Sequence, residues 1–211
     1  MLIALTALAL IAAAPEPAKG PAGFQMPKEA PGKVDPARVS AGTYKVDPEH
    51  TLVVFTVDHM GFSNYFGIFG GATGELTLDP KRLSAARVSV SIPLSRLTVT
   101  NEQLKGHMSG PDFFEIAKFP AATFTSTSVT PTGKTTARIA GTLTIKGKAT
   151  PVTLQARFTG AGAGPMPPHG QNVGFEATTV VSRTALGIAY GVPMVSDRVE
   201  LKITAAFEKA G

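Results

Sequence analysis

The residues that could carry chemistry in this sequence are few and scattered. Its four histidines are His50, His59, His107 and His169, and no two of them have the spacing of a local metal motif such as H-E-x-x-H. The chain has no cysteine, so disulfides and thiolate metal sites are excluded. We therefore predict no metal site and no cofactor, and interpret the histidines as hydrogen-bonded structural residues. A metal site assembled in space remains the alternative.

Motifs for nucleophilic or nucleotide-dependent catalysis are missing too. A nucleophile elbow needs G-x-S-x-G, but residues 106–110 read G-H-M-S-G, with the serine one position late. The sequence contains neither a phosphate loop nor a dinucleotide fingerprint. Arg183 lies between apolar residues, and its guanidinium would need an anionic partner if it pointed inward. The alternative is an outward-facing arginine whose stem packs on the sheet.

The charge balance is mildly basic. The 20 lysines and arginines against 15 acidic residues give a net charge of +5. Such a charge suits an anionic lipid head or a membrane surface, but many soluble proteins carry as much without such a partner. No stretch combines dense Lys and Arg with interleaved aromatics, so we expect no nucleic-acid partner.

The N-terminal region differs in composition from the rest. Residues 1–14 form an apolar run that is too short to cross a bilayer, which takes ~20 residues, and is typical of a secretory signal. We expect a signal peptide over residues 1–22, with cleavage after Ala14 or Ala22. Residues 15–40 hold six prolines and no apolar period, which predicts a disordered linker over 23–40. The folded domain is expected over 41–208.

The elements that must position any functional residue are predicted to be β-strands. In the central stretch 51–71, Val53, Phe55, Val57 and His59 share one face of an extended strand, because successive side chains alternate sides. About eight or more such strands are separated by turns, a pattern that favours an all-β sandwich or barrel and does not choose between them. The predicted strands are 42–46, 51–59, 62–69, 73–78, 87–94, 122–129, 135–145, 151–159, 173–181 and 199–207.

Two segments interrupt this pattern. Residues 100–108 begin with a Thr or Asn cap and place Leu104 and Met108 four positions apart, which predicts a short helix. A second brief turn is expected to start at Asp112, with Phe113 and Phe114 plugging the end of the sheet or touching a ligand. Residues 160–172, rich in glycine and proline, predict a long flexible loop.

Five separate motifs resemble one family, in the order in which that family has them. They are Y-K-V-D-P-E-H-T from Tyr44, F-T-V-D-H-M-G-F-S from Phe55, G-H-M-S-G-P-D-F-F-E-I-A-K-F-P-A-A-T-F-T-S from Gly106, G-T-L-T-I-K-G from Gly141 and S-R-T-A-L-G-I from Ser182. Together they are similar to the signatures of the YceI-like lipid and polyisoprenoid-binding domain.

The resemblance implies an eight-stranded antiparallel, lipocalin-like β-barrel with one or two short helices, exported to the periplasm. Its apolar interior would sequester or transport a polyisoprenoid, either a polyprenyl phosphate or an isoprenoid quinone, or a similar long-chain amphiphile. It also implies a protein that is not an enzyme. A transient contact with a membrane surface and a homodimer are left open.

On this basis we predict which residues meet the ligand. Those expected to line or close the cavity are Phe55, Val57, Phe66, Phe69, Ile92, Phe113, Phe114 and Phe124. His59, His107 and Arg183 are the candidates for contact with a polar head. Two alternatives stay open: an enzyme on the same barrel that uses His59 or His107 as acid or base, and a structural module whose packed interior leaves no cavity.

Overall fold

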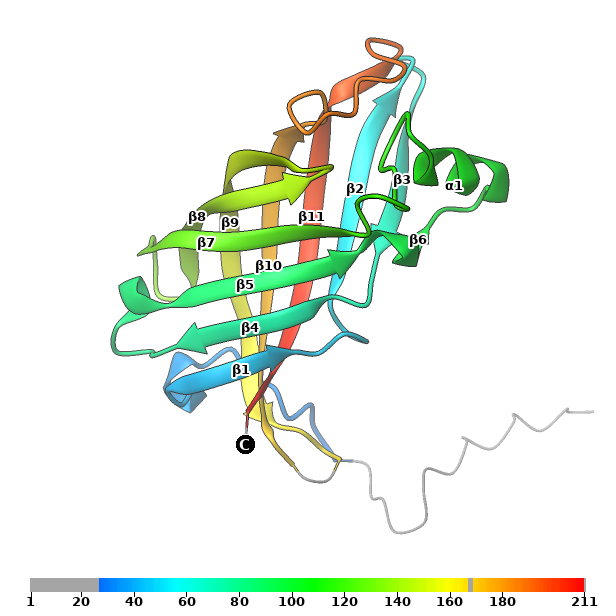
Figure 1. Cartoon of the computed structure of the whole chain (residues 1–211). Helices are drawn as coiled ribbons and strands as arrows, with labels where there is room; N and C mark the ends of the chain where they lie inside the picture. The colour runs from blue at the N-terminus through cyan, green and yellow to red at the C-terminus, as the bar shows by residue number, and fades with distance from the viewer. Residues whose placement is uncertain (1–26, 167–168, 211) are drawn as a thin grey trace, which may run out of the picture.

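The computed structural model describes residues 27–166 and 169–210. Within them, eleven strands form one sheet, together with one α-helix and three short 3₁₀ helices (Figure 1). The strands are β1 (Gly42–Val46), β2 (Leu52–His59), β3 (Ser63–Phe69), β4 (Thr73–Leu78), β5 (Arg87–Pro93), β6 (Leu97–Thr98), β7 (Ala121–Pro131), β8 (Thr136–Ile145), β9 (Lys148–Ala163), β10 (Gln171–Ser182) and β11 (Val195–Lys209). The helices are α1 (Glu102–Ser109), η1 (Pro36–Arg38), η2 (Leu83–Ala85) and η3 (Leu94–Arg96).

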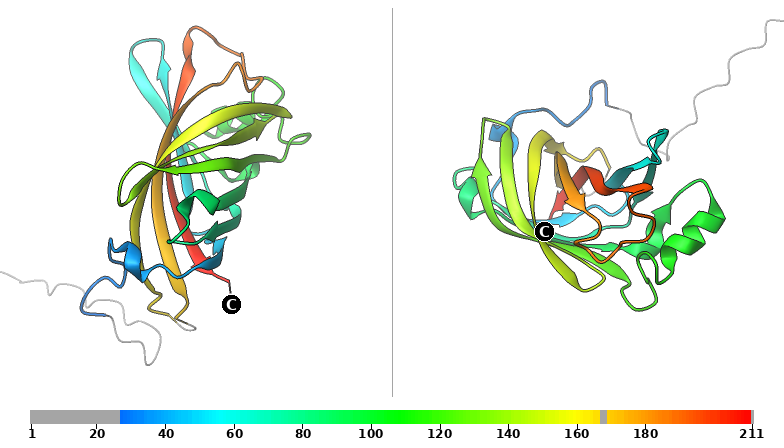
Figure 2. Two further views of the ribbon diagram at one scale, coloured as in Figure 1. Left: turned by 90° about the vertical axis from the view of Figure 1, so that its left-hand side faces the viewer. Right: turned by 90° about the horizontal axis from the view of Figure 1, so that it is seen from above.

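Eight strands close into an antiparallel barrel, which confirms the predicted fold. Their order is β1-β4-β5-β7-β8-β9-β10-β11, and pairing of β11 back onto β1 completes the circle. The remaining strands continue the sheet outward from β11 in the order β2-β3-β6. They lie with α1 at one side of the barrel (Figures 1 and 2).

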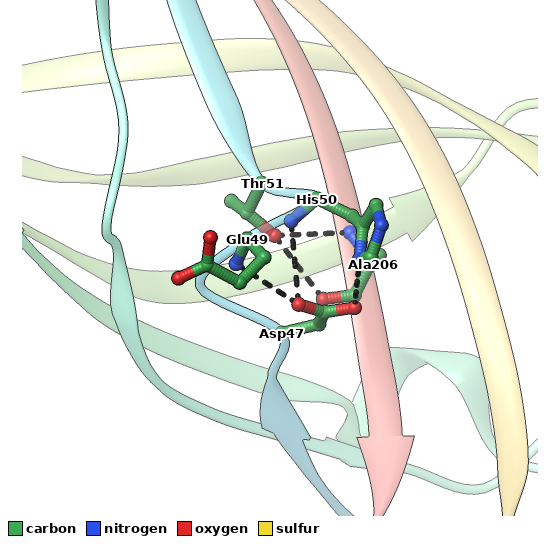
Figure 3. A network of polar contacts seen from close by, with 5 residues as sticks. All are labelled: Asp47, Glu49, His50, Thr51 and Ala206. Atoms are coloured by element: carbon green, nitrogen blue, oxygen red, sulfur yellow. Dashed lines mark hydrogen bonds and ion pairs between the residues drawn. The ribbon is translucent and has the colours of Figure 1, made fainter. Parts of the chain in front are cut away.

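One edge of β11 pairs with β10. Its other edge pairs with both β2 and β1, because the chain turns between β1 and β2. The Asp47 carboxylate accepts the backbone N–H groups of Glu49 and His50 at 3.0 and 3.2 Å, and its other oxygen lies 2.6 Å from His50 Nδ1 (Figure 3). The Thr51 hydroxyl then accepts the N–H of Ala206 on β11 and donates to its carbonyl, at 3.1 and 3.2 Å. These Thr51 hydrogen bonds hold the turn against β11 between its two paired parts. The N-terminal part of β11 pairs with β2, and its C-terminal part pairs with β1.

The predicted short helix is confirmed. α1 is capped by Asn101, whose side chain accepts the N–H of Leu104 at 2.9 Å, and Met108 is its buried residue. After Pro111 the chain forms turns, so α1 is the single α-helix of the described residues. None of the helices in these residues has the length and apolarity needed to cross a membrane.

Two apolar clusters occupy the interior. The upper core lies where β2, β3 and α1 meet the barrel and contains Phe55, Phe69, Leu97, Met108 and Phe114, among others. The lower core lies at the opposite end, around the fully buried Tyr44, with Leu76, Phe158, Val173 and Phe207. The space between these clusters is the interior of the barrel.

The predicted loop at 160–172 is shorter in the structure, because strands take up both of its ends. β9 continues to Ala163 and β10 begins at Gln171. The glycines of this hairpin leave room for another part of the chain, since a Cβ on Gly162 would lie 2.2 Å from the carbonyl oxygen of Pro31. These glycines allow two backbone segments to approach closely. In the sequence they look the same as the glycines of a flexible loop.

Part of the segment expected to be a disordered linker contacts the barrel through that hairpin. Lys33 forms a β-bridge with Ala161, Asp35 caps η1 by accepting the N–H of Ala37 at 3.0 Å, and Val39 is buried in the lower core. Residues 33–39 therefore have defined structure. The proline-rich composition of this segment predicted disorder and gave no indication of these contacts. The expected signal peptide lies outside the described residues.

Candidate ligand-binding site

A cavity of about 290 Å³ lies inside the barrel. Its walls come from β4, β5, β7, β8, β9, β10 and β11, with contributions from the adjoining ends of β2 and β3. The lining is aliphatic and aromatic, apart from glycine and six polar side chains. These six are Thr51, Arg87, Lys134, Thr135, Thr136 and Thr179.

The space exists because small side chains face inward on three neighbouring strands. Ala137 of β8 pairs with Ala156 of β9, which in turn pairs with Ala177 of β10, and all three line the cavity. Side chains directly opposite on neighbouring strands are close neighbours on one face of the sheet. A belt of three methyl groups in register therefore leaves empty the volume that Leu or Phe would fill.

The deep end of the cavity is the upper core. Phe69 and Phe114 both line it, and their rings meet edge to face with centroids 5.4 Å apart. Behind them Phe55 packs on Phe69 at 5.9 Å, in space left by Gly67, where a Cβ would lie 2.6 Å from the Phe55 ring. These aromatic rings close the barrel interior at this end.

The other end is open to solvent. Among all the lining residues the structure describes, the exposed ones are Pro36, Arg87, Gly133, Lys134 and Thr136. They belong to η1, the start of β5, the turn between β7 and β8, and the start of β8. We call this group the mouth.

The size of the cavity excludes a fully packed structural module. A water molecule takes up about 30 Å³ in the liquid, so the cavity could hold roughly ten waters. It is also larger than the engineered apolar cavity of ~150 Å³ that binds benzene. If such a volume were enclosed and dry, it would cost about 7 kcal/mol at ~24 cal/mol per Å³, comparable with the whole stability of a small domain.

Four of the predicted ligand residues lie on the cavity wall. Phe69 and Phe114 form its deep end, Ile92 lies on β5, and Phe124 lies on β7. The ring of Phe124 packs over Gly141 of β8, where a Cβ would lie 2.5 Å from it. The structure therefore brings these four together around one apolar space.

The other predicted apolar residues lie elsewhere. Phe55 is buried behind Phe69, while Val57 and Phe113 are partly buried and pack against the upper core. Phe66 points to solvent with 63% of its surface exposed. The difference arises because β2 and β3 leave the closed barrel, so their inward faces meet the upper core and the opposite face is open to solvent.

The two candidate histidines also lie away from the cavity lining. His59 is exposed at the end of β2. His107 Nε2 lies 3.0 Å from the Asp112 carboxylate, and its ring packs edge to face on Phe113 and Tyr190, with centroids 5.0 and 4.8 Å away. These contacts tie α1 to the loop between β10 and β11.

Arg183 is buried, with 6% of its surface exposed, and its partners are backbone carbonyls. The guanidinium donates to Ser196 and Val195 at 2.8 and 2.7 Å, and to Ile188 and Tyr190 at 3.2 and 2.7 Å. Neither sequence interpretation anticipated this arrangement, because both placed the charge against an anion or water. Burial lowers the pKa of this guanidinium, and the Asp197 charge opposes that shift.

Arg183 thus joins the loop between β10 and β11 to the start of β11, and its donors are occupied by the carbonyls of these two segments. The neighbouring Asp197 accepts the N–H of Thr184 at 2.8 Å. Hydrogen bonds from the Ser182 hydroxyl and from this N–H lower the pKa of the Asp197 carboxyl below its ordinary value. Nowhere in the described residues do three His, Asp or Glu side chains gather to hold a metal ion.

Sequence reasoning missed two sets of site residues. The alanines of the belt lie on the inward faces of three neighbouring strands. Small residues at inward positions were the one sequence feature that could have indicated a cavity there. Arg87 was expected at the start of the strand 87–94 and Lys134 in a hairpin turn, and it is the pairing of β5 with β7 and of β7 with β8 that brings them to one mouth.

Comparison with known proteins agrees with this geometry. The sequence matches the YceI-like domain over residues 44–207. The chain belongs to this family. It is 37% identical to protein YceI of Salmonella arizonae over 166 residues, which are 78% of this chain and 85% of that protein. A UPF0312 protein of Pseudomonas putida (strain W619) is 34% identical over 166 residues, with the same shares covered.

Solved structures share the fold. BcnA of Burkholderia cenocepacia matches with a TM-score of 0.66 at 22% identity, covering 82% of this chain and 99% of that one. A polyisoprenoid binding domain from Saccharophagus degradans matches with a TM-score of 0.58 at 14% identity, covering 79% and 98%. The YceI-like chain described here thus has the barrel of these proteins.

Proposed function

We propose that this YceI-like protein binds a polyisoprenoid, or a similar long-chain amphiphile, inside its barrel. The observation that carries this proposal is the apolar cavity of about 290 Å³, open at one end. Burial of an apolar chain gains ~25 cal/mol per Å², so such a ligand needs few polar contacts. Ligand pockets are typically concave and mostly apolar, with a few polar groups, as here.

The composition of the lining favours binding over turnover. Among the described residues that line the cavity, the ionisable side chains are Arg87 and Lys134, both at the mouth. General acid–base catalysis needs a titratable group within hydrogen-bond reach of the reacting atoms. His59 and His107, the candidates for an enzyme, lie outside this lining, so no observation favours a reaction on the bound chain.

The isoprenoid class and the location are inferred from relatedness and sequence. The Saccharophagus degradans domain with the same fold is described as polyisoprenoid binding. We infer a polyprenyl phosphate or an isoprenoid quinone as the ligand, sequestered or transported in the periplasm. The apolar leader at residues 1–14 supports export.

The test is native mass spectrometry, with lipid extraction, on protein purified from its own periplasm. The expected result is one intact isoprenoid lipid per barrel, still unchanged after long incubation, on a chain that has lost its leader. Repeated recovery of an empty barrel, together with no binding of polyprenyl phosphate or quinone in vitro, would contradict the proposal. Conversion of the bound lipid would support the enzyme instead.

A further inference from the structure

The mouth brings two cations to the edge of an otherwise apolar cavity. Arg87 is the first residue of β5, and its guanidinium donates to the carbonyls of Ala86 and Ser84, at 2.7 and 3.2 Å. Lys134 lies in the turn between β7 and β8. Both residues line the cavity and both are exposed, so a ligand head at the mouth could meet them and water together.

These two cations differ from several others on the barrel, which have acidic partners. Arg157 pairs with Glu176 at 2.7 Å, and Arg198 pairs with Glu200. Within the described residues, Arg87 and Lys134 form no ion pair, and no carboxylate is among the residues that line the cavity. Arg87 and Lys134 are therefore not neutralised by an ion pair within the part of the chain that the structure describes.

Two acidic residues directly precede prolines that line the cavity. Asp35 precedes Pro36 of the mouth, and its carboxylate caps η1 by accepting the N–H of Ala37 at 3.0 Å. The other is Asp79, which is paired with Arg82. Asp79 precedes Pro80, which lines the cavity, and the Asp79 carboxylate accepts from Arg82 Nε at 2.9 Å and from the N–H of Lys81 at 2.9 Å. The Arg82 hydrogen bond, the largest cause, and the Lys81 N–H keep the pKa of Asp79 below its ordinary value. Asp79 thus stays paired with Arg82 and does not cancel the charge at the mouth.

The rest of the wall suits a single chain that points away from these charges. On β5 the lining runs from Arg87 at the mouth through Val88 and Val90 to Ile92, five residues further along, which is about 16 Å of strand. The lining becomes aromatic at the deep end and has no ionisable group there. Burial of a charged head at that end would leave the charge unpaired, which is strongly unfavourable.

We propose that Arg87 and Lys134 bind the anionic head of the ligand at the mouth, with its chain directed toward Phe69 and Phe114. This inference rests on the proposed function and narrows it, because it favours a prenyl phosphate over a neutral quinone or alcohol. Arginine offers a planar fork for phosphate oxygens and lysine a compact positive charge. Since both lie near solvent, their contribution falls as salt rises.

The experiment compares farnesyl phosphate with farnesol, which has the same chain and no charge. Affinities are measured by calorimetry at low and high salt for the wild type and for the double variant Arg87→Gln/Lys134→Gln. We expect the double variant to lose about tenfold in affinity for farnesyl phosphate at low salt and to keep its affinity for farnesol. Circular dichroism checks that the variant is folded.

The matched control is Lys202→Gln. Lys202 is exposed on β11 beside Leu201, which lines the cavity, and Lys202 itself does not line it. We expect this variant to bind both probes as the wild type does. An equal loss of farnesyl phosphate affinity in the control would assign the effect to overall charge and overturn the inference.

The outcomes separate this inference from the proposed function. If farnesol binds to the wild type but the double variant keeps full affinity for farnesyl phosphate, the head site is wrong and the lipid-binding proposal stands. If neither probe binds to the wild type, the proposed function itself fails. Inorganic phosphate is the third probe, and binding as tight as that of farnesyl phosphate would overturn the inference in favour of a site for free phosphate.

Discussion

The barrel interior and the upper core are built from the same kind of strand, yet one is hollow and the other is filled. Both have apolar side chains alternating with polar ones along β-strands. In the upper core a glycine stands opposite an aromatic ring, as Gly67 does for Phe55, and residues from α1 and the following turns complete the packing. In the barrel Ala137, Ala156 and Ala177 stand side by side, and no ring from a neighbouring element fills the space.

This comparison shows that alternation decides which face is buried, whereas the sizes of side chains on adjacent strands decide whether that face encloses a cavity. Protein interiors are otherwise packed as densely as organic crystals. A row of small residues in register is therefore a stronger indication of a ligand space than an abundance of phenylalanine. Four variants test this difference between the filled and the hollow region.

The largest effect is expected for Phe114→Ala in the upper core. Phe114 is buried, with 9% of its surface exposed, and packs edge to face on Phe69. Its loss should lower the free energy of unfolding by about 3–5 kcal/mol and extend the cavity at its deep end. The measurement is chemical denaturation, with Phe113→Ala as a control. Phe113 is only partly buried, so equal losses for the two variants would contradict the role of Phe114 as the end wall.

The next effect concerns the loop that closes the top of the upper core. Arg183→Met removes the donors to four backbone carbonyls. We expect a loss of about 3 kcal/mol in unfolding free energy, because buried acceptors lose their partners. The folded fraction should still bind farnesyl phosphate with wild-type affinity. A loss of that affinity without a loss of stability would indicate that Arg183 binds the ligand.

The hollow region is tested by filling it. Ala156→Phe places a ring in the alanine belt, and we expect at least about a tenfold loss of prenyl ligand affinity with stability unchanged or raised, since the ring occupies existing space. Gln155→Phe is the matched control, because Gln155 is the preceding residue on β9 and is exposed. Calorimetry and thermal denaturation give both quantities. Unchanged affinity in Ala156→Phe would place the ligand outside the barrel.

The smallest effect is a pH dependence near Arg183. Asp197 has a lowered pKa, chiefly through the Ser182 hydroxyl and then the Thr184 N–H. Its contribution to stability is thus fully present above the ordinary value of 3.8 and is lost as pH falls through the lower folded value. Asp197→Asn should lower the melting temperature slightly at about pH 7 and not at about pH 2. An equal decrease at both values would assign the effect to packing.

Much of the fold could be predicted from the sequence because its signals are local. Alternation located all the strands except β6, and a Thr or Asn cap at residues 100–101 predicted the start of α1. Closure into a barrel came from the resemblance of five motifs to a family, because periodicity alone fits a sandwich equally well. Strands were predicted at 151–159 and 173–181, but the ends of β9 and β10 near Gly162 were assigned to a loop, since glycines that allow close approach of backbones look like glycines of a loop.

The site could be predicted only in part, because lining the cavity depends on pairing across the barrel. Phe69 and Phe55 both point inward, but Phe55 stands behind Phe69. The contacts of His107 and Arg183 depend on how the turns after α1 and β10 fold back, which alternation in the sequence does not predict. Arg87 and Lys134 are separated along the chain, and they reach one mouth because β5, β7 and β8 are consecutive neighbours in the sheet.

The most direct test of the central claim is a crystal structure of the protein with farnesyl phosphate bound. We expect the prenyl chain inside the barrel, beside Ala156 and Phe124, with its phosphate at the mouth near Arg87 and Lys134. A chain bound on the outer surface, for example over the exposed Phe66, with an empty barrel interior, would contradict it.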